Sequence, residues 1–364
     1  MAPPPDKSSG VGKYSEEIRQ GLAKEEAVTM QYFPAEQLRP IAFAKHAIKA
    51  GQASEDVVHV QFDYVLFGRF TLMSWIFFPT LFLTSRVTGT DVFVTMHEVI
   101  TPDLIRGRLS VLKSVYIKIL NQVIVTTAMH IVFLSEFAER NFVASTGIED
   151  YSQIPHGVPR SDPESRLDTA RSAFGYDPDE TVIAAPGYVS PRKGSDIFKS
   201  IAESMPDYQF LLAGGSPREK YDDFFNRIQR TAPPNLCMTG VLDDGEFKQS
   251  FVSADIAVLP YQEVYQNGIK NTVAQSGIFN QCVAHELPVV ASDCPYFDDI
   301  ESEWGCVRTF ETVEEATSII RELLNDDEER ERVKESMQNF KNYNRIENVI
   351  HKHLDVYTTV REAT

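Results

Sequence analysis

Two cations and a glycine follow a hydrophobic segment in the middle of the chain. Residues 181–185 read TVIAA, which is typical of a buried strand, and residues 185–195 read APGYVSPRKGS. Arg192 and Lys193 therefore lie in the loop that leaves a predicted parallel strand, where open α/β sheets bind ligands. Gly187 allows this loop to turn sharply. A guanidinium and an ammonium at this place favour an anionic ligand.

A second segment has the features of an anion site. Residues 275–293 read QSGIFNQCVAHELPVVASD: a polar turn (Gln275, Ser276, Gly277), a helix with one apolar face, and a buried strand. The first helical turn carries no acidic residue, so its free N–H groups and positive helix end are suited to a phosphate. The alternative is an ordinary connection in which Ser276 only caps the helix. The two cations of the first loop favour the anion site.

Histidine chemistry is expected at one position in the first half. His97 follows the predicted strand 91–95 and so lies on the ligand side of an α/β sheet, whereas His59 is in the middle of a strand and is expected in the core. Gly10 and Gly12 are part of a two-glycine turn, residues 8–14, that is typical of a phosphate loop. The PPPDK segment before it cannot pair in a central sheet position, so we expect the first strand to be missing.

Composition limits the class of protein. The chain has 364 residues, of which 43% are hydrophobic, enough for two globular domains. Its net charge of −17 argues against a nucleic-acid partner, which would require a basic face. The four cysteines form no CxxC pair, which favours reduced, buried thiols over disulfides or a zinc site. No DxD motif and no cluster of His and Asp residues in the sequence predicts a metal site.

The sequence contains no segment expected to span a membrane. The longest apolar run, residues 72–84, is too short, and the polar, Pro-rich start does not resemble a signal peptide. We expect a cytoplasmic protein. Residues 104–122 form an amphipathic helical region with Arg106, Arg108, Lys113 and Lys118. Two interpretations are open: a helix face in contact with water, or peripheral contact with anionic lipid on the inner face of a membrane.

Strands and helices alternate along both halves, which predicts an α/β protein with parallel sheets. We expect domains at 1–160 and 161–342, followed by a helix at 343–364 that packs back on the first domain. The expected strands are 28–33, 57–62, 91–95, 131–134 and 152–154 in the first domain, and 181–185, 208–213, 235–239, 255–259, 288–292 and 305–308 in the second.

Together these motifs resemble those of a known family. A strand, Gly187, a short loop, Arg192-Lys193-Gly194 and a helix are similar to the diphosphate loop of family 4 glycosyltransferases (glycosyl transferases group 1), and the QSG turn before PVVAS is similar to the donor-site helix of a QSG-turn variant. The resemblance implies a GT-B fold: two Rossmann-like domains whose parallel sheets face a cleft, with a C-terminal helix that crosses back.

The resemblance also implies an activity: retaining transfer of a hexose, mannose or glucose, from a nucleotide-diphosphate sugar to a glycan or lipid-linked acceptor, with no metal or other cofactor. Lys193 and His97 would be catalytic, His97 by contacting the transferred sugar. Whether Arg192 is a second phosphate ligand or a surface residue stays open. The implied diphosphate ligands are Arg192, Lys193, Ser276 and Gly277; Gly187, Val241, Leu242, Gln275 and Gln281 would bind the nucleoside and sugar, and Gly10 and Gly12 the acceptor or phosphate.

Three positions depart from the family pattern. Many members carry a glutamate pair where this chain has Val273 and Gln281, and an arginine where it has Tyr188. Gln281 can bond a ribose hydroxyl, but Val273 cannot. Glu263 is either a replacement carboxylate or a solvated loop acid. A non-catalytic GT-B binding subunit and a GT-B nucleotide-sugar epimerase are therefore the alternative functions.

Overall fold

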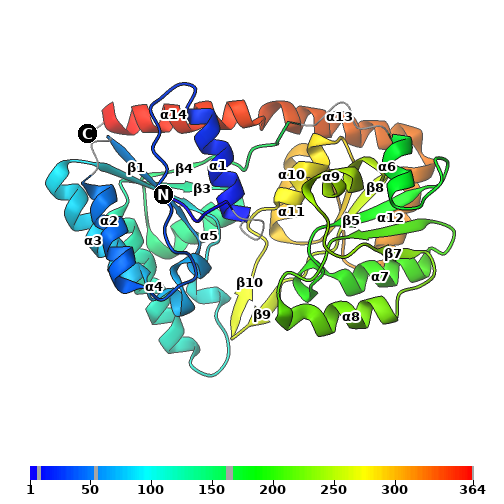
Figure 1. Ribbon diagram of the computed structural model, residues 1–364, viewed down its shortest axis with the longest axis horizontal. Helices are drawn as coiled ribbons and strands as arrows, with labels where there is room; N and C mark the ends of the chain where they lie inside the picture. Colours follow the sequence, from blue (N-terminus) through cyan, green and yellow to red (C-terminus); the bar gives the residue numbers. More distant parts are fainter. Residues whose placement is uncertain (6–9, 53–55, 161–166, 363–364) are drawn as a thin grey trace. The chain divides into compact units, whose positions relative to one another are not determined.

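A computed structural model describes residues 1–5, 10–52, 56–160 and 167–362, and the chain divides into two compact units (Figure 1). Unit 1 comprises Met1–Gly157, Tyr265–Gln275 and Ile346–Thr364; unit 2 comprises Val158–Val264 and Ser276–Arg345. The boundaries lie within a few residues of the expected ones. The difference is the segment 265–275, which the sequence analysis assigned to the second domain and which packs with the first.

Unit 1 is built on a parallel sheet of four strands in the order β1-β2-β3-β4. Val58, Val60 and Phe62 of the first strand are buried, as are Val92 and Val94 of the second, so the sheet lies inside an apolar core. The strands are β1 (Val57–Phe62), β2 (Asp91–Met96), β3 (His130–Phe133) and β4 (Tyr151–Gln153), and the helices are α1 (Gly10–Leu22), α2 (Pro40–Gly51), α3 (Ser74–Thr88), α4 (Ser110–Thr127), α5 (Glu136–Thr146) and α14 (Ile346–Glu362), with short 3-10 turns η1 (Tyr64–Phe67), η2 (Arg69–Thr71) and η3 (Pro102–Leu104).

At the start of the chain no strand precedes α1 among the described residues, but the first two residues pair beside β1. The Gln61 N–H donates to the Met1 carbonyl at 2.9 Å, and the Phe33 N–H donates to the Ala2 carbonyl at 3.2 Å. Met1 and Ala2 thus lie beside β1, and Ala2 forms a parallel bridge with Tyr32. The pairing stops there because the prolines that follow have no N–H to donate. The expected strand at 28–33 is reduced to this bridge.

Helix α1 corrects a second expectation. Gly10 is the first residue of the helix and Gly12 lies within its first turn, so these two glycines are helical and do not form a loop. Ser8 and Ser9, which the expected turn included, lie outside the described residues. The helix packs against α14 so closely that a Cβ on Gly21 would come within 1.7 Å of Ile350 Cδ1. In Figure 1 the two helices are dark blue and red.

Helix α4 starts later than the pattern at 104–122 predicted. Gly107 and Leu109 both have positive φ, 93° and 84°, and a helix cannot continue through left-handed residues. The helix therefore begins at Ser110 and runs on to Thr127.

Unit 2 contains a six-stranded parallel sheet in the order β12-β11-β8-β5-β6-β7. The chain order reverses between β5 and β8, which makes this pair the topological switch point of a doubly wound sheet. Every strand lies within three residues of its predicted position: β5 (Val182–Pro186), β6 (Gln209–Ala213), β7 (Leu236–Met238), β8 (Ile256–Leu259), β11 (Val289–Ser292) and β12 (Arg308–Phe310).

Helices cover both faces of this sheet (Figure 1). Among them are α7 (Ser195–Ser204) and α9 (Asp244–Val252). The unit also contains α6 (Leu167–Ala173), α8 (Asp222–Arg230), α10 (Gly277–Ala284), α11 (Pro295–Trp304), α12 (Val313–Asn325) and α13 (Asp327–Tyr343), together with the 3-10 turns η4 (Pro191–Lys193) and η5 (Glu219–Tyr221).

The segment 265–275 was not predicted as structured. Strands β9 (Val264–Gln266) and β10 (Ile269–Asn271) form a hairpin whose turn residues, Asn267 and Gly268, both have positive φ. Its Gly268 carbonyl accepts a hydrogen bond from the Arg106 N–H at 2.7 Å, and Ile269 forms an antiparallel bridge with Ile105. These contacts explain why the segment packs with unit 1.

Unit 1 buries several neutral histidines. The His353 ring is fully buried, and neither ring nitrogen has a hydrogen-bond partner among the described residues. It lies 5.4 Å from the His59 ring, centroid to centroid, and His59 bonds the Tyr357 hydroxyl at 2.5 Å and the Thr95 hydroxyl at 2.7 Å. His59 is therefore the satisfied core histidine that the sequence predicted. Burial lowers the pKa of His353 to about 4.

Acidification should therefore destabilise unit 1 through His353. The folded pKa is below the unfolded value of about 6.5, so the unfolded chain binds the proton first and stability is lost as pH falls from 6.5 to 4. The full loss is roughly 3 kcal/mol for this group. His353→Phe should reduce the fall in Tm between pH 7 and 4.5. His351→Phe, which changes an exposed histidine of the same helix, should not; equal slopes for the two variants would contradict the assignment.

Candidate functional site: the switch point of unit 2 and the strand ends of unit 1

The loops after β5 and β8 meet at the switch point of unit 2. Lys193 lies in the loop after β5, and Tyr261 lies in the loop after β8. The Lys193 ammonium lies 3.8 Å from the centroid of the Tyr261 ring, a close cation–π contact. The position of the lysine depends on Gly194, whose φ is 62° and whose Cβ, if present, would lie 1.7 Å from the Pro260 carbonyl oxygen. A glycine here lets the two loops approach each other.

The charge of Lys193 is poorly compensated. Its side chain is half-buried, and burial lowers its pKa to about 7, with a further lowering by the Arg192 guanidinium. No carboxylate among the described residues offsets these effects. Arg192 itself is exposed, and its carbonyl accepts a hydrogen bond from the Gln262 N–H at 2.8 Å. Within the described residues, the surroundings of the ammonium therefore favour its neutral form.

Tyr261 also connects this loop to helix α10. Its hydroxyl and the Ser276 Oγ are 3.0 Å apart, and the Ser276 Oγ accepts a hydrogen bond from the Phe279 N–H at 3.1 Å as the N-cap of α10. The Ser276 side chain is buried, so its hydroxyl caps the helix, and the anion-binding potential belongs to the N–H groups of the first turn. That turn contains no acidic residue, as predicted.

Gly187 faces the same helix. A Cβ on Gly187 would lie 3.6 Å from Ile278 Cγ1. A Cβ on Gly214 would lie only 2.0 Å from the carbonyl oxygen of Gly187. Only glycines allow the strand ends of β5 and β6 to lie this close to each other. Gly187, Lys193, Ser276 and Gly277 are thus brought together at one end of the unit 2 sheet.

The other predicted donor residues are more dispersed. Val241 is 83% exposed and lies over Gly215, and Leu242 packs against a small cluster that includes Tyr176 and Val182. Gln281 is half-buried in the second turn of α10. Gln275 lies in the unit 1 segment, with its buried Oε1 lacking a partner among the described residues. Of the departures, Val273 is a buried packing residue, Tyr188 is 44% exposed, and Glu263 is half-buried, so it is not a fully solvated acid.

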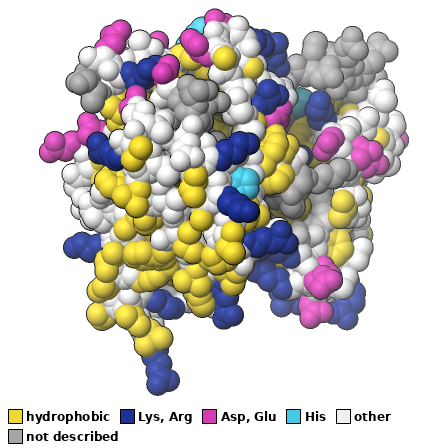
Figure 2. All heavy atoms as spheres, turned by 60° about the vertical axis from the view of Figure 1, so that its left-hand side comes forward, with side chains coloured by type: hydrophobic (Ala, Val, Ile, Leu, Met, Phe, Trp, Pro, Cys, Tyr) yellow, Lys and Arg dark blue, Asp and Glu magenta, His cyan; other side chains and the backbone are white. Residues whose placement is uncertain are grey.

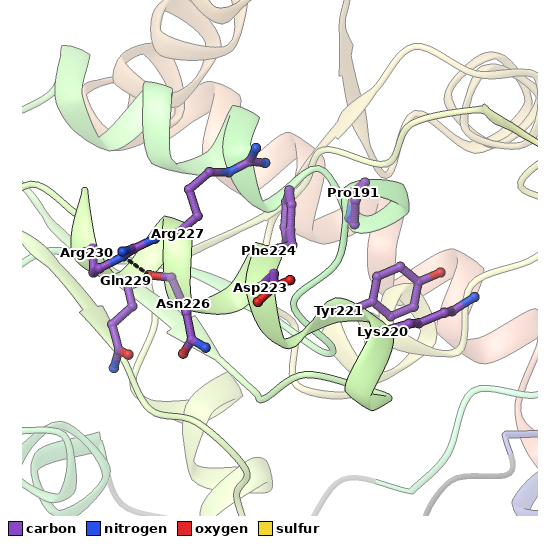
Figure 3. Close-up of a pocket in the computed structure, with 9 residues that line it drawn as sticks. All are labelled: Pro191, Lys220, Tyr221, Asp223, Phe224, Asn226, Arg227, Gln229 and Arg230. Carbon is purple, nitrogen blue, oxygen red and sulfur yellow. Dashed lines mark hydrogen bonds between the residues drawn. The ribbon is translucent and has the colours of Figure 1, made fainter.

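A hollow of about 860 Å³ borders the same loop through Pro191 (Figure 3). Its other lining residues come from η5 and α8 and include Lys220, Arg227 and Arg230 against one acid, Asp223. Arg230 Nε donates to the Asn226 carbonyl at 3.3 Å. Neither Lys193 nor Tyr261 lines the hollow, so it is separate from the Lys193–Tyr261–Ser276 cluster.

The strand ends of unit 1 contain a second group of polar side chains. His97 follows β2, is 5% exposed, and its Nε2 is 2.8 Å from Gln61 Oε1. Its Nδ1 and the buried Tyr14 hydroxyl have no partner among the described residues. The Tyr14 ring lies 5.2 Å from the His97 ring and 4.5 Å from the His156 ring, centroid to centroid. Burial, with a contribution from His156, lowers the pKa of His97 to about 3, so this imidazole is neutral.

Gln61 also lines a cavity of about 900 Å³ between α1, β1 and α14. This volume is in the range of small-molecule sites. His97 itself does not line the cavity, but it bonds Gln61, which does.

The sequence analysis did not select Tyr261, Tyr14 or Gln61. Tyr261 could have been found by the argument that selected Lys193, because it too follows a strand at the ligand side of the sheet. Tyr14 and Gln61 had no comparable signal, since their role depends on contacts with α1 and β2 that no local pattern encodes.

Comparison with known proteins defines the class. The solved structure of a sucrose-phosphate synthase from Thermosynechococcus elongatus superposes on this chain with a TM-score of 0.72 at 13% identity, over 98% of this chain and 94% of that one. HepE of Anabaena, solved with UDP-glucose, gives a TM-score of 0.68 at 13% identity over 93% and 88% of the two chains. The chain has the GT-B fold, as predicted.

The family prediction is also confirmed. Residues 180–326 match the family model described as glycosyl transferases group 1, so this part of the chain is a glycosyltransferase domain of that group. The processive diacylglycerol alpha-glucosyltransferase of Acholeplasma laidlawii is 27% identical over 137 residues, 37% of this chain and 38% of that protein. The match thus spans less than half the length of this curated relative.

The low pKa of Lys193 predicts pH-dependent binding of a nucleoside diphosphate. A bound diphosphate would raise this pKa, so binding takes up a proton and affinity should fall as pH rises above 7, by up to about tenfold per unit. Calorimetric Kd values for UDP between pH 7.5 and 9 would measure the slope. Lys193→Arg, which stays charged, should give a flat profile, and a slope retained in that variant would assign the proton to another group.

Tyr261 should contribute to binding mainly through its ring. Tyr261→Leu removes the cation–π contact and should weaken binding of UDP by about tenfold, from a contribution of up to ~2 kcal/mol in a desolvated setting. Tyr261→Phe keeps the ring and loses only the hydrogen bond to Ser276, so we expect a few-fold loss. Equal Kd values for the two variants in calorimetry would show that the ring does not matter.

Proposed function

We propose that the protein is a retaining hexosyltransferase that uses a nucleotide-diphosphate sugar. One observation carries the proposal: the incompletely compensated ammonium of Lys193 lies on the Tyr261 ring, and Tyr261 bonds the N-cap of α10, at the switch point of the unit 2 sheet. A diphosphate would complete this arrangement, because it accepts hydrogen bonds from helix N–H groups and pairs with the cation.

In the proposed step, the bond between C1 of the sugar and the β-phosphate oxygen breaks, and the electron pair stays on the diphosphate. The acceptor hydroxyl oxygen bonds to C1 on the same face, and its proton passes to the leaving phosphate oxygen. Lys193 and the N–H groups of Gly277 and the next residues stabilise the developing negative charge. No protein nucleophile takes part. We further propose that His97, as a neutral imidazole, contacts the transferred sugar.

The proposed donor is UDP-glucose and the proposed acceptor is lipid-linked. The relative from Acholeplasma laidlawii is named as a diacylglycerol alpha-glucosyltransferase, which supports glucose over mannose and a lipid over a free glycan. A lipid-linked acceptor implies peripheral contact with a membrane. We also propose that catalysis requires no metal, because fixed cations and helix N–H groups can stabilise the leaving group. EDTA should then leave the transfer rate unchanged.

The first test is thermal stability with UDP, GDP and ADP in turn. Ligand at about a hundred times its Kd adds roughly 2.7 kcal/mol, and we expect UDP alone to raise Tm. Lys193→Ala should abolish the shift, whereas Lys199→Ala, on α7 and paired with Glu203, should retain it. A folded protein that none of the three nucleotides stabilises would favour the non-catalytic binding subunit.

The second test is transfer itself. Wild type with UDP-glucose and diacylglycerol should release UDP and form an α-glucosyl lipid, and Lys193→Ala should reduce kcat by at least about a hundredfold, the usual cost of losing one preorganised charge. Conversion of the nucleotide sugar to its epimer without transfer would instead identify an epimerase.

A further inference from the structure

Helix α4 is apolar on both of its faces. Ile117, Leu120 and Ile124 point into the core of unit 1 and are buried. On the outer side, Val111, Leu112, Val115 and Ile119 are 78%, 66%, 50% and 49% exposed. Their spacing places them along one stripe of the helix. A surface helix normally presents polar residues there, so the outer stripe is an unusual place for four aliphatic side chains.

The stripe continues into neighbouring loops. Leu109 before the helix is 62% exposed, and Phe70 and Leu72 near η2 are 63% and 42% exposed. The Tyr116 hydroxyl donates to the Phe70 carbonyl at 2.6 Å and accepts from Trp75 Nε1 at 2.7 Å, which fixes this loop beside α4. We call the set of Phe70, Leu72, Leu109, Val111, Leu112, Val115 and Ile119 the α4 face. Figure 2 shows hydrophobic side chains gathered over the lower part of this side of the molecule.

Two residues of the α4 face are held in strained backbone conformations. Phe70 has φ 57° and Leu109 has φ 84°, in the left-handed region that is unfavourable for a residue other than glycine. Strain of this kind is found where a position has a function beyond stability. Here it accompanies large apolar side chains on the surface.

The charge around the α4 face is opposite to that of the whole protein. The chain carries a net charge of −17, yet residues 103–122, which contain most of helix α4 and the loop before it, carry four cations (Arg106, Arg108, Lys113 and Lys118) and one acid, Asp103. Arg69, Arg108 and Lys118 are exposed beside the apolar residues, and Figure 2 shows Lys and Arg side chains around and below the hydrophobic area.

We propose that the α4 face docks on the surface of an anionic lipid bilayer. The apolar residues enter the boundary between headgroups and acyl chains, while the cations contact lipid phosphates. Trp75 and Tyr116, each with an apolar ring and a polar tip, suit the same depth. None of the described helices is long and apolar enough to cross a membrane, which fits binding in the plane of the interface. The proposal rests on the lipid-linked acceptor of the proposed function.

Charge favours lipid over a second copy of the chain. In a symmetric dimer, the α4 face of one chain would lie against the α4 face of the other. The same cations would then lie opposite one another and repel. Anionic lipid instead supplies negative charge opposite every cation.

The test is flotation of the full chain with vesicles of phosphatidylcholine alone or with about one third phosphatidylglycerol. Wild type should bind the anionic vesicles, and less at high salt. Leu109→Ser/Leu112→Ser should weaken partitioning at least about tenfold, and Arg108→Gln/Lys118→Gln should remove the preference for anionic lipid. The matched control is Leu83→Ser/Val87→Ser, in the last two turns of α3, where the residues are 64% and 87% exposed but lie outside the α4 face. It should bind like wild type.

Tm shifts with UDP, measured on the same samples, separate this inference from the proposed function. All variants should keep the wild-type shift, because no substitution touches unit 2. If UDP stabilises the wild type but the wild type does not bind anionic vesicles, the proposal that the α4 face docks on lipid is wrong and the proposed nucleotide site is unaffected. A dimer in size-exclusion chromatography that Leu109→Ser/Leu112→Ser dissociates would also overturn it, in favour of a second copy.

Discussion

The close approach of the loops after β5 and β8 determines the chemistry of unit 2. Parallel strands with reversed chain order leave a crevice at their carboxyl ends, and this chain fills the crevice with a lysine on a tyrosine ring. Burial opposes the charge of the ammonium, the ring supports it only partly, and Arg192 adds repulsion. An anion at this cluster would offset both effects, which is the physical basis of the proposed diphosphate site.

That arrangement depends on residues that carry no charge. Gly194 and Gly214 have positive φ and leave room for backbone oxygens where a Cβ would clash. Ser276 stabilises α10 by capping it and keeps its first N–H groups directed along the helix axis. Tyr261 connects both elements, because its ring lies under the cation and its hydroxyl bonds the cap. Substitution at any of these positions would affect binding through the position of Lys193 or of the helix.

The sequence predicted the elements of unit 2 well, because each strand is a continuous apolar run bounded by turn residues. It placed Lys193 in the loop after a strand and Ser276 and Gly277 at the start of a helix, and the structure has them there. Their role in binding a ligand stays a prediction. The sequence predicted less well where contacts between distant segments determine the local structure. Gly10 and Gly12 look like a loop locally but lie in a helix packed on α14, and the hairpin at 264–271 pairs with a segment more than a hundred residues away. Roles for Val241 and Leu242 rest on the resemblance alone.

Helix α4 illustrates a further limit of reading hydrophobic patterns. An apolar stripe indicates a surface that avoids water, but the sequence does not say whether protein or lipid covers it. In α10, where Phe279, Cys282 and Val283 are buried, protein covers the stripe. In α4 protein covers only one of two stripes, and the second lies among cations in an otherwise acidic chain. A protein that acts on a lipid would need such a surface, and a protein that acts on a soluble sugar would be expected to have lost it, because exposed aliphatic residues promote aggregation. The α4 face is thus the feature of unit 1 that bears most directly on the acceptor.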